Sequence, residues 1–289
     1  MVIAGTKTEE NLKAAFAGES QARNRYTFSG RLAREAGLHD VADVFFELAA
    51  NEEEHARQEF EFLGGLSDVR AALEQAAAGE HHEHEVVYPC FAQTAREEGL
   101  SDVASFFERM TRVEGTHEQR FRALLRSLDG EEAFKGKTVL HSLTKMAQVM
   151  LPNQANPHGF VHGGELMKII DNAAGVTAVR HSRQYVVLAR VAELNFHRPV
   201  QVSDVALVDS RVSFVSRSTM EIQVLLDAES LETAETHRAV SAYLIMVAVD
   251  SKGNPVEVPP LLLSTEEQER LFEEGKARYE AHKRLRAKA

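Results

Sequence analysis

Hydrophobic positions in the first 130 residues recur every three or four residues, which is the period of an amphipathic helix. The spacing is carried by Leu12, Ala15, Phe16 and Glu19, and again by Val41, Val44, Phe45 and Leu48. Glycines interrupt this pattern at positions 37, 64, 65, 79 and 99, where turns or helix ends are expected. The pattern predicts four long helices, near 8–36, 39–63, 80–98 and 101–129, and a shorter helical piece near 67–78.

The pattern changes from about position 141 to alternating segments rich in β-branched residues. Such segments, bounded by polar turns, predict strands at 185–194, 205–216, 219–229 and 238–249. One helical stretch, from Gly163 to about His181, precedes them. One central helix and about five antiparallel strands predict an α+β domain whose sheet wraps the helix.

Length and pattern together predict a multidomain chain. At 289 residues it is long enough for about two domains of ~150 residues each. We expect an all-α four-helix bundle over 1–130, a linker over 131–138 and the α+β domain over 139–263. A C-terminal helix is expected over 264–289, with Ser264 and Glu267 forming a capping box at its start.

Composition narrows the function classes. The net charge of −11 argues against nucleic-acid binding, which needs basic surface. No apolar run reaches the ~18 residues of a membrane span, and the N-terminus lacks a secretion signal. The single cysteine, Cys90, excludes an internal disulfide and is expected to be a small packed residue. A cytoplasmic protein is therefore expected, with neither nucleic acid nor membrane as a partner.

Glutamate and histidine are paired at helical spacing in the first half. Residues three apart on a helix share a face, so each pair aims two ligand atoms at one point. Four helices that supply such pairs form the inward pattern of a carboxylate-bridged di-metal site. The residues of this pattern are Glu19, Glu52, His55, Glu80, Glu83, Glu114 and His117.

An internal repeat strengthens this interpretation. Residues 34–42 match residues 96–104 at an offset of 62, and the same offset carries Glu52 onto Glu114 and His55 onto His117. Taken singly, each of these side chains is best interpreted as an ordinary charged residue on a helix surface. The set is better explained by metal, because buried carboxylates without cations are costly. His81, His82 and His84 form a second cluster, but His81 and His82 should point to other faces of the helix.

The first half resembles the rubrerythrins, in the segments 15–26, 78–83 and 88–89. The resemblance covers nearly all of residues 5–129 and implies a ferritin-like di-iron domain that reduces hydrogen peroxide. It assigns the seven residues above as ligands of two iron ions, with manganese or a mixed pair as alternatives. Glu83 and His55 would exchange at one iron with redox state. Tyr26 and Tyr88 would hydrogen-bond the carboxylates.

The chain departs from that family in one respect. Typical rubrerythrins carry a rubredoxin domain whose four cysteines hold an electron-transfer iron, and those cysteines are absent from this sequence. An external electron donor such as a rubredoxin, or a neighbouring chain, is therefore expected. Peroxide reduction, oxygen scavenging, iron oxidation and a purely structural metal all remain open.

In the second half, the informative stretch is residues 156–171. His162, Gly163 and Gly164 lead directly into the central helix. Backbone N–H groups at a glycine-rich helix start favour developing negative charge, as on a thioester carbonyl turning into an oxyanion. Asp171 follows about two turns later and is a candidate for activating water. By themselves these residues leave hydrolysis as one interpretation beside an ordinary solvated aspartate.

This half resembles the hotdog-fold acyl-CoA thioesterases of the brain acyl-CoA hydrolase type. The similarity rests on 156–171 and 195–200, extends over about 139–262, and fits residues 273–278 of the last helix. It implies Asp171 as general base or nucleophile and Asn156, from a different protomer, as the residue that positions water or substrate. The N–H of Gly163 or Gly164 would polarise the carbonyl. Candidate coenzyme A contacts are Arg211, Arg217, Ser218 and Thr219.

Together the halves predict an enzyme, a thioester hydrolase joined to a di-iron domain with a peroxide-reducing (oxidoreductase) or redox-sensing role. The alternative is a di-iron peroxidase whose hotdog half binds acyl-CoA or only oligomerises. Hotdog dehydratases are a further rival, but their catalytic histidine has no motif here. We expect a homo-oligomer, a dimer at minimum and a hexamer if the hotdog half dictates assembly. Redox control of hydrolysis, a structural bundle and two independent enzymes all remain open.

Overall fold

The computed structural model describes residues 3–65, 68–130 and 135–286. The chain divides into two compact units, Met1–Phe134 (unit 1) and Lys135–Ala289 (unit 2), each treated by itself. Of the expected linker, 131–134 lie outside the described residues, and Lys137 and Thr138 form the short strand β1 (Lys137–Thr138). No helix of the described residues combines the length and apolar character needed to cross a membrane.

Unit 1 is helical, as predicted. Its elements are α1 (Lys7–Glu35), α2 (His39–Phe62), α3 (Val69–His82), the π-helical turn η1 (Glu83–Val87), α4 (Tyr88–Glu97) and α5 (Ser101–Leu128). The predicted helix end at Gly79 is wrong, because the chain stays helical from α3 through η1 into α4. A glycine costs only about 1 kcal/mol inside a helix, which packing against α5 readily offsets.

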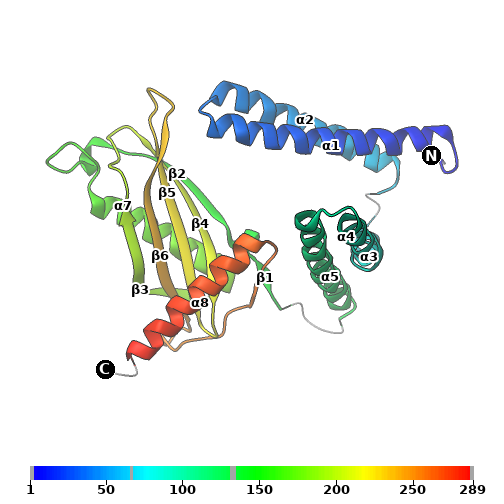
Figure 1. The fold of residues 1–289 in the computed structure, drawn as a ribbon. Helices are drawn as coiled ribbons and strands as arrows, with labels where there is room; N and C mark the ends of the chain where they lie inside the picture. The colour runs from blue at the N-terminus through cyan, green and yellow to red at the C-terminus, as the bar shows by residue number, and fades with distance from the viewer. Residues whose placement is uncertain (1–2, 66–67, 131–134, 287–289) are drawn as a thin grey trace. The chain divides into compact units, whose positions relative to one another are not determined.

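The helices of unit 1 pack as two hairpins, α1 on α2, and α3 and α4 on α5 (Figure 1). Both hairpins turn in the same way. Gly37 and Gly99 adopt φ of 76° and 78°, and the next residue's N–H reaches back to Ala33 and Ala95 respectively. These left-handed positions favour glycine, which explains the repeated Gly-Leu at both turns.

Unit 2 contains a five-stranded antiparallel sheet in the order β2-β4-β5-β6-β3. Its strands are β2 (Thr144–Val149), β3 (Tyr185–Phe196), β4 (Val205–Val215), β5 (Thr219–Glu229) and β6 (Thr236–Val249). The four predicted strands are confirmed, and β2 is the fifth. Shorter elements are α6 (Val139–Ser142), the 3-10 turn η2 (Pro152–Gln154), and β7 (Leu261–Leu262), which pairs in parallel with β1.

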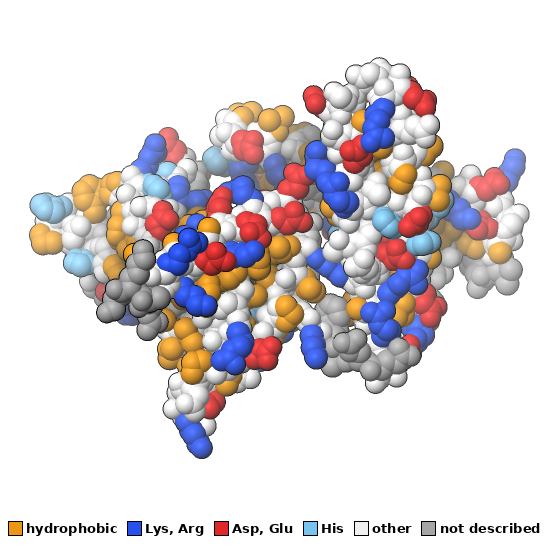
Figure 2. All heavy atoms as spheres, turned by 60° about the horizontal axis from the view of Figure 1, so that its bottom comes forward, with side chains coloured by type: hydrophobic (Ala, Val, Ile, Leu, Met, Phe, Trp, Pro, Cys, Tyr) orange, Lys and Arg blue, Asp and Glu red, His pale blue; other side chains and the backbone are white. Residues whose placement is uncertain are grey.

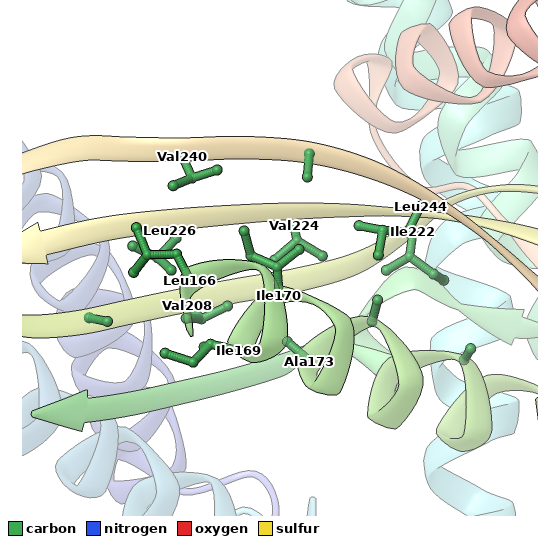
Figure 3. Packing of buried hydrophobic residues seen from close by; sticks show 14 of the residues in the cluster. Leu166, Ile169, Ile170, Ala173, Val208, Ile222, Val224, Leu226, Val240 and Leu244 are labelled. Atoms are coloured by element: carbon green, nitrogen blue, oxygen red, sulfur yellow. The ribbon is translucent and has the colours of Figure 1, made fainter. Parts of the chain in front are cut away.

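The central helix α7 (Gly163–Ser182) lies against one face of this sheet (Figure 1). Its apolar residues meet alternate residues of the strands, since successive strand side chains point to opposite faces. Figure 3 shows Leu166, Ile169 and Ile170 of α7 in one buried cluster with residues of the sheet such as Val208, Ile222 and Leu226. The prediction of a sheet wrapped on one helix, the hotdog arrangement, is thus confirmed.

The last helix, α8 (Glu266–Arg286), covers the other face and packs on β4. Glu221, next to the core residue Ile222, points to this side and is fully buried. Arg278 of α8 binds it through two nitrogens, at 2.7 and 3.0 Å, and Ser213 donates a third bond at 2.9 Å. The close approach needs Gly275, where an added Cβ would lie 2.6 Å from Phe214 Cβ.

The start of α8 differs by one residue from the predicted capping box. Thr265, not Ser264, accepts the first hydrogen bond, from Gln268 N at 3.2 Å. Gln268, not Glu267, reaches back, and accepts from Ser264 N at 2.8 Å. Glu267 instead binds Arg211 at 2.7 Å, an ion pair with β4 that local sequence spacing did not indicate.

Candidate functional site

In unit 1, α1 and α2 bring Glu19, Glu52 and His55 together, with one ligand atom from each within 4.8 Å of the others. His55 Nδ1 lies 2.9 Å from Glu52 Oε2, as their three-residue spacing predicts. A hydrogen bond with Glu52, followed by burial, raises the pKa of Glu19 above its ordinary value. The carboxyl groups are therefore close enough to repel one another, which a cation would relieve.

A second, equivalent cluster joins Glu80 of α3 to Glu114 and His117 of α5. His117 Nδ1 lies 2.7 Å from Glu114 Oε2 and 3.5 Å from Glu80 Oε2. Burial, and next the Glu114 carboxyl, raise the pKa of Glu80 to about 7. Six of the seven predicted ligands thus lie in two three-residue clusters, one on each hairpin.

Glu83, the seventh, begins the π-helical turn that links α3 to α4. Glu83 lies three residues after Glu80, and its negative charge contributes to raising the pKa of Glu80. A π-helical turn inserts an extra residue into a helix and is frequent at functional sites. The turn packs against α5, where His84 Nδ1 lies 2.9 Å from Thr111 O and its ring faces Gly115.

The two tyrosines differ in how closely they approach the clusters. Burial, and then the charges of Glu83, Glu114 and Glu80, raise the pKa of Tyr88, so its hydroxyl lies near the second cluster. Tyr26 packs on Phe45 at a ring distance of 6.1 Å. The hydrogen bonds described in this part of the chain include none from either hydroxyl to a ligand carboxylate, and that role stays a prediction.

The histidines at 81, 82 and 84 do not form a cluster of their own within the described residues. His81 pairs with Glu118 at 3.1 Å, and His84 binds α5 as above. Glu59, however, is an acidic residue that the spacing analysis missed. It lies one turn after His55, its charge helps raise the pKa of Glu19, and its buried Oε2 has no hydrogen-bond partner. The four-residue step from His55 was the available signal.

These donors fit a pair of divalent or trivalent cations. Carboxylates with one imidazole per metal suit iron and manganese. The orphaned Glu59 oxygen and the raised pKa values of Glu19 and Glu80 are what such cations would compensate. Glu19, Glu52 and His55 would hold the metals from one hairpin, and Glu80, Glu83, Glu114 and His117 from the other. The helical domain with its two clusters therefore implies a di-metal site.

In unit 2, Asp171 lies on α7 at an apolar cavity of about 40 Å³. The cavity is formed between α7, β3 and β6, and its wall is almost entirely apolar, with the exposed residue Asp171 at its edge. The wall consists of Met167, Ile170, Leu188, Val191, Leu194, Ala242 and Leu244. A carboxylate near an apolar cavity of this size combines a proton acceptor with room for the first carbons of a hydrocarbon chain at most.

The loop before α7 places the other predicted residues. Asn156 Oδ1 accepts hydrogen bonds from His158 N at 2.8 Å and Phe160 N at 3.3 Å, so its amide nitrogen is the end left for a ligand. His162 Nδ1 accepts from Gly164 N at 2.9 Å. The hydrogen bonds described for this loop include none from Gly163 N, which makes Gly163 the better candidate donor to a carbonyl.

Three of the four predicted coenzyme A residues lie on or next to the turn between β4 and β5, and Arg211 lies inside β4, opposite Gln223 of β5. Arg217 is exposed there, and Ser218 and Thr219 are half-buried. Thr219 also lines an open groove of about 530 Å³ with Arg190, Tyr279 and His282. Arg211 differs, because its guanidinium is already bound to Gln223 and Glu267, each at 2.7 Å.

Known proteins match each unit separately. The rubrerythrin family matches residues 10–125 and 71–156, and the thioesterase superfamily matches 158–235. A rubrerythrin of Porphyromonas gingivalis is 43% identical over 46% of this chain and 73% of its own length. A cytosolic acyl coenzyme A thioester hydrolase of Rattus norvegicus is 38% identical over 49% of this chain, which spans only 38% of that protein.

Solved structures agree for unit 2. A hexameric acyl-CoA thioesterase, in its apo form, has 32% identity and a TM-score of 0.51, covering 53% of this chain and 99% of that one. The chain therefore belongs to two families, with an N-terminal domain of the rubrerythrin family and a C-terminal hotdog domain of the acyl-CoA thioesterase type.

Proposed function

We propose that unit 2 hydrolyses acyl-CoA thioesters to a free acid and coenzyme A. The observation that carries this function is the position of Asp171 at the edge of the apolar cavity between α7, β3 and β6. The family match to acyl-CoA thioester hydrolases supports the same substrate class. The cavity would take the start of the acyl chain, and the carboxylate would lie beside the thioester carbon.

The reaction needs one base and one oxyanion site. Asp171 accepts a proton from water as the water oxygen bonds to the thioester carbon. The Gly163 N–H, at the positive end of α7, stabilises the negative charge on the carbonyl oxygen. When the C–S bond breaks, the sulfur leaves with the electron pair and takes up the proton as the thiol of coenzyme A.

The remaining residues position the reactants. The Asn156 amide nitrogen, from a second protomer, would hold the water or the carbonyl, since its oxygen is used within its own loop. Arg217, Ser218 and Thr219 would bind the nucleotide part of coenzyme A at the β4–β5 turn, and Arg211, further along β4, is the fourth candidate. We propose a homo-oligomer, a dimer at minimum and a hexamer like the solved neighbour, acting in the cytoplasm.

The test is release of free coenzyme A from acyl-CoA substrates of increasing chain length. Asp171→Asn should lower kcat by 10²–10⁴-fold with little change in KM, because the loss of a general base acts on the transition state. The matched control is Asp209→Asn, an exposed carboxylate paired with Lys145 at the β2–β4 edge, which should keep its rate. A wild-type protein that hydrolyses no acyl-CoA would leave unit 2 as a binding or assembly domain, and the di-metal domain as the main function.

Unit 1 carries a second function, which we propose to be binding of two iron ions for peroxide reduction or redox sensing. The two carboxylate–histidine clusters carry this proposal. Iron, when bound, would supply electron transfer to a peroxide, and the glutamates and histidines of the two clusters would hold the ions and balance their charge. Electrons would come from an external donor such as a rubredoxin.

The test is metal content together with reduction of hydrogen peroxide by the iron-loaded, reduced protein. We expect about two iron ions per chain and oxidation of the reduced centre by peroxide. Glu114→Ala should lose both. Glu118→Ala, one turn further along α5 and bound to Arg122, is the matched control and should keep both. If the protein binds iron but hydrogen peroxide does not oxidise the reduced iron, the metal would have a structural role.

A further inference from the structure

Each ligand cluster lies on a stripe of apolar residues that is left open on its own hairpin. On α2 the stripe runs through Val41, Val44 and Leu48 to Glu52 and His55, at helical steps of three and four. These apolar residues are exposed, Val44 by 55%. Apolar side chains on the same face as metal ligands are expected to be covered, since together they form the inside of a bundle.

Helix α5 carries the matching stripe at the offset of 62 residues. Val103, Phe106 and Met110 lead to Glu114 and His117, and Phe106 is 45% exposed. On the face shown in Figure 2, acidic and basic side chains are interspersed and apolar side chains lie exposed among them. The α1–α2 stripe and the α3–α5 stripe thus have the same length, pattern and ligand positions, and each supplies the surface that the other needs.

Neither cluster is sufficient alone. Two cations need more than the three side chains that each hairpin brings together, whereas both hairpins supply all seven ligands. A closed bundle therefore has to join an α1–α2 hairpin to an α3–α5 hairpin. The remaining question is whether the two hairpins belong to one chain.

The connection between the hairpins is too short for closure within one chain. A ferritin-like bundle has one long crossover, so that α2 and α3 run in the same direction past the metals. From Glu52 to the end of α2 is ten residues, about 15 Å, and from the start of α3 to Glu80 is eleven, about 16 Å. The crossover must therefore span about 31 Å along the bundle.

Only six residues, 63–68, connect Phe62 to Val69, and seven extended steps reach about 25 Å at most. Unwinding the helix ends would lengthen the connection, but both ends are capped. Gly64 adopts φ of 80° and Gly65 N donates to Phe60 O at 2.9 Å. Asp68 accepts from Ala71 N at 3.0 Å at the start of α3.

We propose that a second copy of the chain closes the bundle, with α1–α2 of one copy packed on α3–α5 of the other. This arrangement rests on the di-metal function proposed above. Each of the two metal pairs in such a dimer takes Glu19, Glu52 and His55 from one chain and the remaining four ligands from its partner. The metal site is incomplete in a single chain. The amount of iron bound therefore measures how much of the protein is paired with a second copy.

The test is complementation between two variants of the full chain. One carries Glu52→Ala with His55→Ala and the other Glu114→Ala with His117→Ala, each with a different affinity tag. Alone, neither should bind a metal pair. Co-expressed and purified through both tags, the mixed oligomer should bind about a quarter to a half of the wild-type iron, because each mixed pair rebuilds one of its two sites. The mass of the oligomer and hydrolysis of acyl-CoA check that the variants fold.

A longer linker provides the matched control. Inserting about 12 Gly/Ser residues after Gly65 adds about 40 Å of reach and permits closure within one chain. When both variants carry the longer linker, the iron bound by their mixed oligomer should fall towards zero. The chain with the longer linker and all seven ligands should keep its iron. If the wild type binds metal but the mixed oligomer with the natural linker binds none, the shared site is wrong and the di-metal function still stands. A wild-type chain that binds no metal pair would overturn the di-metal function itself.

Discussion

Replacing Arg278 by methionine tests the buried ion pair that joins α8 to the sheet. Glu221 is fully buried, and Arg278 is its bidentate partner. Methionine keeps much of the packing of the arginine stem but removes the charge, so Glu221 would remain as a buried, uncompensated carboxylate with only Ser213 beside it. Breaking one side of a buried pair costs about 3–5 kcal/mol.

This cost predicts a large shift in thermal unfolding. For a unit of this size, 1 kcal/mol corresponds to about 2–4 °C, so unit 2 should unfold about 6–20 °C earlier. Calorimetry separates the transitions of the two units. Adding Glu221→Gln to Arg278→Met removes the buried charge and should restore most of the loss. In the same helix, Arg284→Met at the exposed pair with Glu280 should change little.

The reasoning would be refuted by an Arg278→Met protein that unfolds within 2 °C of wild type. It would also be refuted by a double variant no more stable than the single one, because the loss would then come from packing rather than from charge. Hydrogen exchange of the α8 amides provides an independent measure of whether the helix stays docked.

Three further outcomes are expected. Gly275→Ala should destabilise unit 2 by about 1–3 kcal/mol in thermal unfolding, because the new Cβ would meet Phe214 and Glu221 at 2.6 and 2.7 Å. Gly175→Ala is the matched helical control and should not destabilise the unit, because a Cβ there would meet only Met246 Cε at 3.8 Å. Burial lowers the pKa of His181, so the unfolded state binds its proton first and stability should fall as pH drops below about 6.5. His181→Gln should weaken that pH dependence, and an unchanged melting temperature of wild type between pH 7 and 5 would contradict it. Removing metal with a chelator should lower the melting temperature of unit 1 and leave that of unit 2 unchanged, since ligand at about 1,000 times its Kd contributes about 4 kcal/mol.

Periodicity predicted the elements well where each helix or strand buries one face in the core and exposes the other. The strands from β3 to β6 and the helix α7 start within two residues of their predicted positions, because their alternating or helical pattern extends over many residues. Gly79 misled the prediction, since a glycine can end a helix or be tolerated inside one, and here the helix continues although an added Cβ at Gly79 would meet open space. The π-helical turn at Glu83 had no local signal.

For the sites, spacing along a helix was sufficient to bring Glu52 to His55 and Glu114 to His117, because these pairs depend only on local geometry. It was insufficient for groups whose position depends on distant segments. The buried Oε2 of Glu59, the hydrogen bond from Gly164 to His162 and the pairing of Arg211 with Glu267 all required the folded chain.

The distance along the chain between Glu221 and Arg278 also bears on how the protein is made. Arg278 is synthesised 57 residues after Glu221, which takes about 3–11 s at the usual rate of translation. During that interval the sheet holds a carboxylate on its outer face whose counter-ion has not yet emerged from the ribosome. A nascent sheet in this state is expected to stay loosely packed, so that docking of the last helix is the event that commits the domain to its final form.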